Sequence, residues 1–243
     1  MNNTFSFERF VKVVKYDLKM RVPAIRTMFL VLLVMPHALH FIMAYGETFP
    51  AGQRVDLYAV MTTCLIFFAP FGIYSALREK HGKASFLMLP ASVLEKFASM
   101  FVITLVAVPV LFIISYVAID YVLVLLLKTY YNSFISVDPM ILLRGAMGVF
   151  SIVGAAVLGN AIFKGKAAFK TILCLLVLLV LWGVLLSDLL FDIDKVFPNG
   201  DIGASAVQAK TEMIVNITAT VYTAVGVLFY ILTYWRLKKM QIS

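Results

Sequence analysis

The sequence predicts an all-α membrane protein with six transmembrane helices, and three observations lead to this fold class. Hydrophobic residues make up 62% of the 243 residues and charged residues only 14%, with a mean hydropathy of +0.96. Soluble domains contain about 45 to 50% apolar residues, so this chain is too apolar to be covered by water. Six apolar segments are long enough to cross a hydrocarbon core, which takes about 20 helical residues. The basic residues, finally, gather on alternate connections between these segments.

The six predicted spans together form a transmembrane domain over residues 27–235, followed by a short tail at 236–243. Before the first span, the sequence has no short apolar core with a small-residue cleavage site, so we expect that span to remain as an anchor. The predicted spans are Thr27 to Tyr45, Val55 to Leu77, Phe97 to Ala118, Met140 to Phe163, Thr171 to Leu190 and Met213 to Trp235.

The end of the third span is the least defined boundary, because apolar residues continue past Asp120 through Tyr121 to Leu127. Seven residues cannot cross the membrane alone. Either the helix is long and tilted, or the chain turns and lies in the outer interface near Tyr130 and Tyr131, where aromatic rings favour the headgroups.

The distribution of basic residues predicts that both termini lie in the cytoplasm. With the N-terminus inside, cytoplasmic segments carry 16 of the 21 lysine and arginine residues, and the outer side carries the other five. Cytoplasmic loops of membrane proteins show this bias. The net charge of +8 therefore indicates topology and a lipid surface, and no nucleic-acid partner is expected.

Residues 1–26 contain a pattern that predicts an amphipathic helix lying on the inner leaflet. Five apolar side chains fall within an arc of about 100° on a helical wheel, and four basic ones lie away from it. The alternative is a charged tail surrounded by water. The apolar set is Phe7, Phe10, Val11, Val14 and Leu18; the basic set is Arg9, Lys12, Lys15 and Lys19.

The stretch FLMLPASVLEKF, residues 86–97, predicts a break between two helices in the inner loop 78–96. Pro90 has no backbone N–H and disfavours a helical conformation at Leu89, so a preceding helix should end there. Ser92 and Glu95 have the spacing of a capping box, which predicts that a new helix begins at once.

A search for catalytic and metal-binding patterns finds no phosphate-binding loop and no hydrolase or metalloprotease motif. His37 and His40 are three residues apart in the first span. A metal site there would need further ligands such as Asp56, Asp120 or Asp188 from other helices, and we expect none. Hydrogen bonds to neighbouring helices, or contact with outer-leaflet water, explain the two histidines more simply.

Ionisable side chains near the outer ends of the spans are costly if they face lipid, so they should turn inward or reach the interface. Arg144 paired with Asp120 or Asp188 is the structural ion pair that we predict, and contact with a charged substrate is the alternative. Both readings place the three residues toward the interior of the bundle.

The fourth span contains small residues at every fourth position, which allows helix backbones to approach closely in lipid. These residues are Ser151, Ala155 and Gly159. Prolines interrupt three spans, and the carbonyl groups that they free need partners in neighbouring helices or a cavity. The prolines are Pro36, Pro70 and Pro109.

The stretch LMLPASVLEKF at 87–97, with the six spans, the amphipathic N-terminal helix and both ends inside, resembles the permease subunits of ABC-2-type transporters. The resemblance implies that 1–26 is an elbow-like helix, that loop 78–96 forms a coupling helix docked on a separate ATPase subunit, and that 191–212 is an outer loop. The coupling residues implied are Phe86, Leu87, Leu89, Pro90, Ser92, Glu95 and Lys96.

The function implied by the resemblance is that of a non-enzymatic transport subunit, in an exporter of a bacterial cytoplasmic membrane. It would bind a second permease copy or paralogue, membrane lipid and ATP-binding subunits, with ATP and Mg²⁺ held by the ATPase and no cofactor in this chain. Two alternatives stay open: an intramembrane enzyme acting on lipid through His37, His40 and the outer aspartates, and a structural membrane subunit that only binds partners.

Overall fold

The fold is seen in a computed structural model that describes residues 5–43, 48–78, 86, 89–131, 133–135, 139–196 and 204–242. Side chains are described within these ranges except at 43, 139–144, 186–196, 204–211 and 241–242. The described residues form helices and turns, with no strand among them. Six helical segments are long and apolar enough to cross a membrane, which confirms the predicted all-α fold class with six spans.

The helices follow one another through short turns, and their bounds lie within a few residues of most of the predicted spans. The first span is preceded by α1 and a short 3₁₀ turn, η1, and the second is followed by another, η2. The elements are α1 (Phe7–Met20), η1 (Val22–Ile25), α2 (Arg26–Met43), α3 (Ala51–Ile73), η2 (Ser75–Arg78), α5 (Val93–Phe101), η3 (Val102–Ala107), α6 (Val108–Leu126), α7 (Pro139–Ile162), α8 (Ala167–Val196) and α9 (Ala204–Ile242).

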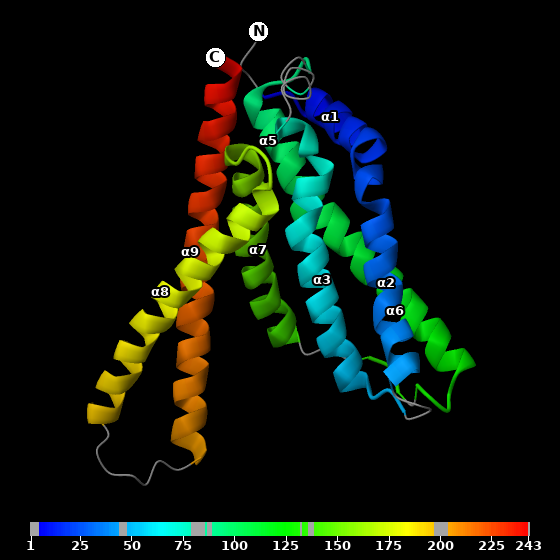
Figure 1. Ribbon diagram of the computed structural model, residues 1–243, viewed down its shortest axis with the longest axis vertical. Helices are drawn as coiled ribbons and strands as arrows, with labels where there is room; N and C mark the ends of the chain where they lie inside the picture. Colours follow the sequence, from blue (N-terminus) through cyan, green and yellow to red (C-terminus); the bar gives the residue numbers. More distant parts are fainter. Residues whose placement is uncertain are drawn as a thin grey trace.

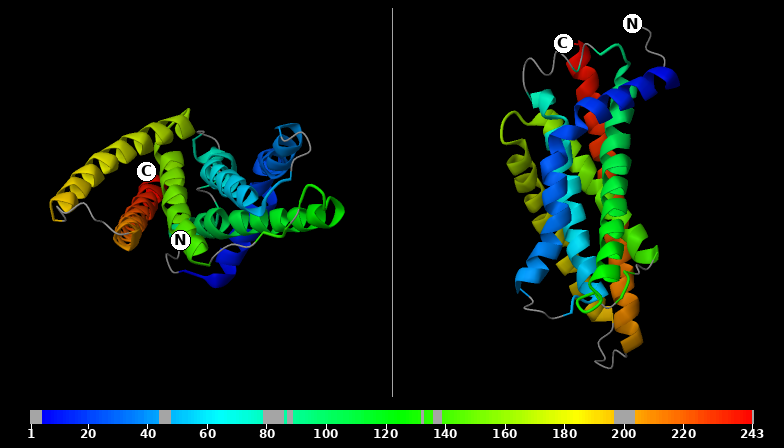
Figure 2. Two further views of the ribbon diagram at one scale, coloured as in Figure 1. Left: turned by 90° about the horizontal axis from the view of Figure 1, so that it is seen from below. Right: turned by 90° about the vertical axis from the view of Figure 1, so that its right-hand side faces the viewer.

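Both termini lie at the same end of the bundle, here called the terminal end, as an even number of spans requires (Figure 1). α1 lies at this end and is inclined to the long helices (Figure 2, right). Viewed along the bundle, α7 stands between the pair α8 and α9 on one side and the group α2, α3 and α6 on the other (Figure 2, left). The contacts of α7 with α3, α8 and α9 agree with this central position.

The third span is one long helical rod made of α5, the π-helical segment η3 and α6. The helix continues to Leu126, so of the two alternatives left by the sequence the long helix is the one observed, and the turn with Tyr130 and Tyr131 follows it. Pro109, the second residue of α6, lies directly after the π segment. Prolines and π-helical segments are both established causes of bends in helices.

The end of α3 shows how a proline-containing helix is satisfied by a neighbour. Asn160 of α7 donates from Nδ2 to the carbonyl oxygen of Tyr74 at 2.9 Å and to that of Pro70 at 3.3 Å. Asn160 is buried, so these bonds provide partners for carbonyl groups that water does not reach. The carbonyl group that Pro70 leaves without its helical donor is that of Ile66, so these two bonds do not test the expectation for the freed carbonyl groups.

Small residues bring α7 close to both α8 and α9, as the four-residue pattern predicted. A side chain at Gly159 would overlap with Thr171 of α8. A Cβ atom at Gly226 of α9 would lie 3.0 Å from the Cα atom of Ser151 and 2.8 Å from the ring of Phe150. Ser151 and Ala155 are buried. The small-residue stripe therefore serves two different neighbours, α9 near Ser151 and α8 near Gly159.

We expect the substitution Gly226→Leu to separate α7 from α9, because the backbone at Ser151 leaves no room for the new side chain. Overpacking of this kind costs about 1 to 3 kcal/mol of unfolding free energy. Unfolding of the purified protein in detergent measures the loss. Gly183→Leu on α8, where a Cβ atom would meet nothing within 4 Å, is the matched control. Equal stability of the two variants would contradict the close contact.

The predicted outer loop 191–212 is too long, because α8 runs to Val196 and α9 begins at Ala204. The helices continue beyond the apolar part of these two spans, so hydropathy alone placed the end of α8 too early and the start of α9 too late. The apolar part of α8, Ala167–Leu185, is almost entirely exposed. α8 also diverges from α9 as the two helices extend away from the terminal end (Figure 1). A surface of this composition is suited to contact with lipid.

Candidate functional site

The start of α5 forms the capping box that the sequence predicted. The Ser92 side chain accepts a hydrogen bond from the Glu95 amide at 3.2 Å, and Glu95 Oε2 accepts one from the Ser92 amide at 2.8 Å. Two N–H groups at the helix start are satisfied in this way. Pro90 lies three residues before the helix, at a bend, so the helix start predicted after it is confirmed.

The other carboxylate oxygen of Glu95 binds the beginning of α1, a contact that sequence reasoning missed. Glu95 Oε1 accepts from the backbone amide of Ser6, the N-cap residue of α1, at 2.7 Å. It also accepts from Arg9 Nε at 3.2 Å and from Arg9 Nη2 at 3.0 Å. Glu95 is fully buried. One carboxylate thus fixes the N-terminal ends of two helices to each other.

A second buried carboxylate, Asp17, joins α1 to α5 and to the residue that follows α3. Asp17 Oδ2 accepts a hydrogen bond from Ser99 Oγ at 2.7 Å and one from the Tyr74 hydroxyl at 3.3 Å. Arg21 Nη1 lies 2.6 Å from Asp17 Oδ1, in an ion pair whose angle is not that of a hydrogen bond. Ser99 lies one helical turn after Glu95, so α1 is held at two successive turns of α5.

Phe86, the first of the coupling residues that the resemblance implied, is not available to a separate subunit here: it is 1% exposed and packs inside the chain itself. The Arg21 guanidinium lies 4.7 Å from the centre of its ring, and Lys96 Nζ lies 5.8 Å from it. The Tyr74 ring packs on Phe86 edge to face. Cations close to an aromatic ring are attracted to its face, so Phe86 stabilises the positive charges of both Arg21 and Lys96.

The other residues that the resemblance assigned to the coupling loop differ in how far their side chains are exposed. Ser92, Glu95 and Lys96 are buried, Leu89 is half-buried and Pro90 is exposed. Leu87 lies outside the described residues. Of these coupling residues, Leu89 and Pro90 are therefore the ones that a separate protein could contact; Leu94 in the same loop is also exposed.

The face of α1 that packs on the bundle differs from its apolar stripe. Val13 and Asp17 are the buried residues of α1, whereas Phe7 is 71% exposed and Leu18 is also exposed. On a helical wheel the centres of these two faces are roughly 90° apart. The first and last residues of the predicted stripe are thus exposed, whereas Phe10, Val11 and Val14 between them are half-buried. We call the assembly of α1, the start of α5, Tyr74 and Phe86 the junction.

At the end opposite the termini, a second buried cluster contains the ion pair of Asp120. Its partner is Arg54 of α3, whose Nη1 donates to Asp120 Oδ1 at 2.5 Å. Arg54 Nη2 also donates to the backbone carbonyl of Ser133. Both charged side chains are buried. Sequence reasoning missed Arg54 and instead paired Arg144 with Asp120 or Asp188. The side chains of Arg144 and Asp188 lie outside the described residues.

His37 lies beside this ion pair, and both of its ring nitrogens face tyrosine hydroxyl groups. Nδ1 is 3.0 Å from the Tyr131 hydroxyl and Nε2 is 3.2 Å from the Tyr58 hydroxyl. Burial raises the pKa of the Tyr131 hydroxyl above its ordinary value. His40 stacks on Phe49, with ring centres 3.8 Å apart. For His37, the expectation of hydrogen bonds to neighbouring elements is confirmed.

Within the described ranges, no three His, Cys, Asp or Glu side chains lie close enough together to hold a metal ion. Comparisons with protein-family models, with curated proteins and with solved structures find no match to this chain. The candidate site is therefore the junction, where two buried carboxylates bind three segments of the chain together.

Proposed function

We propose that this chain is the membrane-spanning permease subunit of an ABC transporter of the ABC-2 type, working as an exporter in a bacterial cytoplasmic membrane. The observation that carries the proposal is the junction: α1 and the start of the third span share the Glu95 carboxylate, directly beside the loop that would meet a partner. The chain itself performs no bond chemistry. ATP and Mg²⁺ belong to a separate ATPase subunit.

The charge distribution supports this proposal, because it is the distribution expected if the terminal end faces the cytoplasm. The basic side chains of α1, of the turn between α7 and α8 and of the last turns of α9 all belong to that end. Cytoplasmic segments of membrane proteins are enriched in lysine and arginine. The exposed Phe7 and Leu18 of the apolar stripe would then lie on the inner leaflet, beside the membrane-facing surface of the bundle.

The junction determines how a movement of the ATPase subunit would be transmitted to the membrane-spanning helices. α1, the start of α5 and the residues after α3 are joined by buried charged hydrogen bonds, so they move as one unit. A displacement of Leu89 and Pro90 would tilt this unit. The π segment and Pro109 lie at the point where α5 joins α6, and they would allow the rest of the third span to bend in response. A second permease copy would complete the pathway.

We expect Leu89→Asp to reduce binding of the ATPase subunit without unfolding the permease, because Leu89 is only half-buried and lies beside exposed Pro90. Burying an apolar side chain of this size contributes about 1.5 to 3 kcal/mol, so binding should weaken by at least about tenfold. Co-purification and transport-stimulated ATP hydrolysis measure the effect.

Phe134→Asp is the control, because Phe134 is 52% exposed and lies at the opposite end of the bundle. It should leave the ATPase bound. Phe86→Asp is not a suitable test, since Phe86 is part of the buried junction. An unchanged ATPase yield with Leu89→Asp would place the partner elsewhere.

A further inference from the structure

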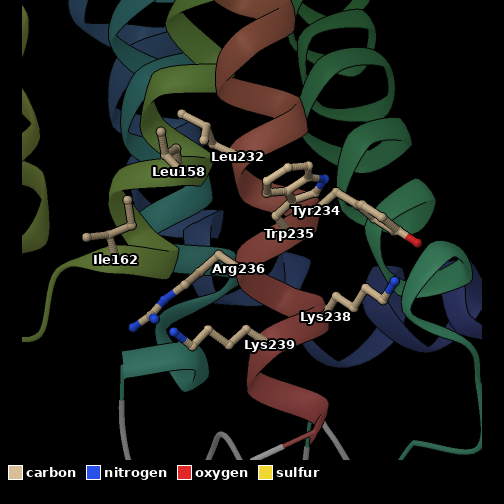
Figure 3. Close-up of a pocket in the computed structure, with 8 residues that line it drawn as sticks. All are labelled: Leu158, Ile162, Leu232, Tyr234, Trp235, Arg236, Lys238 and Lys239. Carbon is tan, nitrogen blue, oxygen red and sulfur yellow. The ribbon is translucent and has the colours of Figure 1, made fainter.

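A groove of about 820 Å³ lies between α7 and the last turns of α9 at the terminal end (Figure 3). Leu158 and Ile162 of α7 line one wall, and they are one helical turn apart. From α9 come Leu232, Trp235, Arg236 and Lys239. These four residues have the spacing i, i+3, i+4 and i+7, so they share one face of α9.

The groove is divided into an apolar part and a basic part along α9. Leu232 and Trp235 come first along the helix and the two cations follow toward the C-terminus, on the same side as Ile162 (Figure 3). Trp235 is 67% exposed, as is common for tryptophan at the level of lipid headgroups. A molecule that fits this order has an apolar tail and an anionic head.

The cations of the groove have unused binding capacity within the described part of the chain. Arg236 Nε is buried and has no hydrogen-bond partner there. The ion pairs among described residues involve other cations: Arg9, Lys12, Arg21 and Arg54. A buried, unpartnered guanidinium nitrogen is costly, and a phosphate oxygen is the partner that this group binds best.

A second copy of this chain offers little negative charge for the groove. Of the described acidic residues at the terminal end, Asp17 and Glu95 are buried and bound within the junction. Glu8 is exposed but paired with Lys12 at 2.6 Å. Charge complementarity therefore favours the phosphate of a lipid over the surface of another permease.

We propose that this groove binds one anionic phospholipid, with the phosphate at Arg236 and Lys239 and an acyl chain along Leu158, Ile162, Leu232 and Trp235. The site would fix the position of α9 against α7 at the membrane surface. This inference needs only the membrane-spanning fold and does not rest on the proposed transport function, so either one can fail without the other.

The test uses tryptophan fluorescence, because the chain has only two tryptophans, Trp182 and Trp235. The full-length Trp182→Phe protein is reconstituted into phosphatidylcholine vesicles with increasing fractions of a lipid brominated near the headgroup end of its acyl chains. Brominated phosphatidylglycerol and brominated phosphatidylcholine are compared. Each basic side chain strengthens the binding of an anionic lipid about fivefold. With Arg236 and Lys239 both contributing, we expect the quenching of Trp235 to show that the groove prefers phosphatidylglycerol to phosphatidylcholine by about 25-fold.

The double variant Arg236→Gln/Lys239→Gln should lose this preference. Lys239→Gln alone, at an exposed position, should reduce the preference about fivefold. Lys238→Gln is the matched control, because Lys238 borders the groove but extends from the other side of α9 (Figure 3). It should keep most of the preference. Equal quenching by the two lipids in the parent protein, or an equal loss in Lys238→Gln and Lys239→Gln, would overturn the proposal.

Discussion

Replacing Asp17 with leucine should destabilise the protein more than any other single change in α1. The substitution leaves the Arg21 guanidinium as a buried charge without its partner, and it removes the acceptor of the Ser99 and Tyr74 hydroxyl groups. Breaking a buried ion pair from one side costs about 3 to 5 kcal/mol. Unfolding in detergent, followed by circular dichroism, should show the loss, and the yield of folded protein from membranes should fall with it.

Two companion variants separate the charge from the hydrogen bonds. Asp17→Asn keeps an oxygen that accepts from Ser99 and loses only the charge opposite Arg21, so its loss of stability should be smaller than that of Asp17→Leu. Glu8→Gln, which breaks an exposed pair in the same helix, should leave stability unchanged. If Asp17→Leu unfolds like the parent protein, α1 is not held by the junction and the proposed rigid unit does not exist.

Arg54→Leu should have an effect of similar size at the opposite end of the bundle. The change leaves Asp120 as an uncompensated buried carboxylate and deprives the Ser133 carbonyl of its donor. The expected cost is again about 3 to 5 kcal/mol of unfolding free energy. The guanidinium also lies 5.1 Å from the centre of the Tyr131 ring, so this aromatic neighbour loses a cation as well.

The double variant Arg54→Leu/Asp120→Leu is the decisive comparison for this pair. Replacing both partners of a buried ion pair with apolar residues is often neutral, so the double variant should recover most of the stability lost in Arg54→Leu. A double-mutant cycle in detergent measures the coupling. If the double variant instead loses as much stability as the two single variants together, Arg54 and Asp120 do not interact.

The parts of the structure that the sequence predicted depend on neighbouring residues along the chain. The capping box needs only Ser92 and Glu95, three residues apart, and the close approach of α7 needs only the spacing of its small residues. The amphipathic pattern likewise placed a helix at α1. In each case the physical cause lies within a few turns of one helix, where periodicity and capping chemistry are informative.

The parts that the sequence did not predict depend on which helices become neighbours. Glu95 was recognised as a cap, but its second oxygen binds Ser6 and Arg9, which are more than eighty residues away. Burial cost predicted that Asp120 needs a cation, yet the choice of Arg54 follows from the packing of α3 against α6. The resemblance implied that Phe86 contacts an ATPase subunit, and its burial was not predicted because it depends on Arg21, Tyr74 and Lys96, two of which belong to other segments of the chain.

The measurement that tests the central proposal most directly is affinity purification of the tagged, unmodified chain from its native membrane in mild detergent, followed by identification of the proteins that come with it. We expect a stoichiometric subunit that carries a phosphate-binding loop and hydrolyses ATP. Recovery of the folded chain without any such subunit, or with partners that bind no nucleotide, would contradict the assignment as an ABC transporter permease.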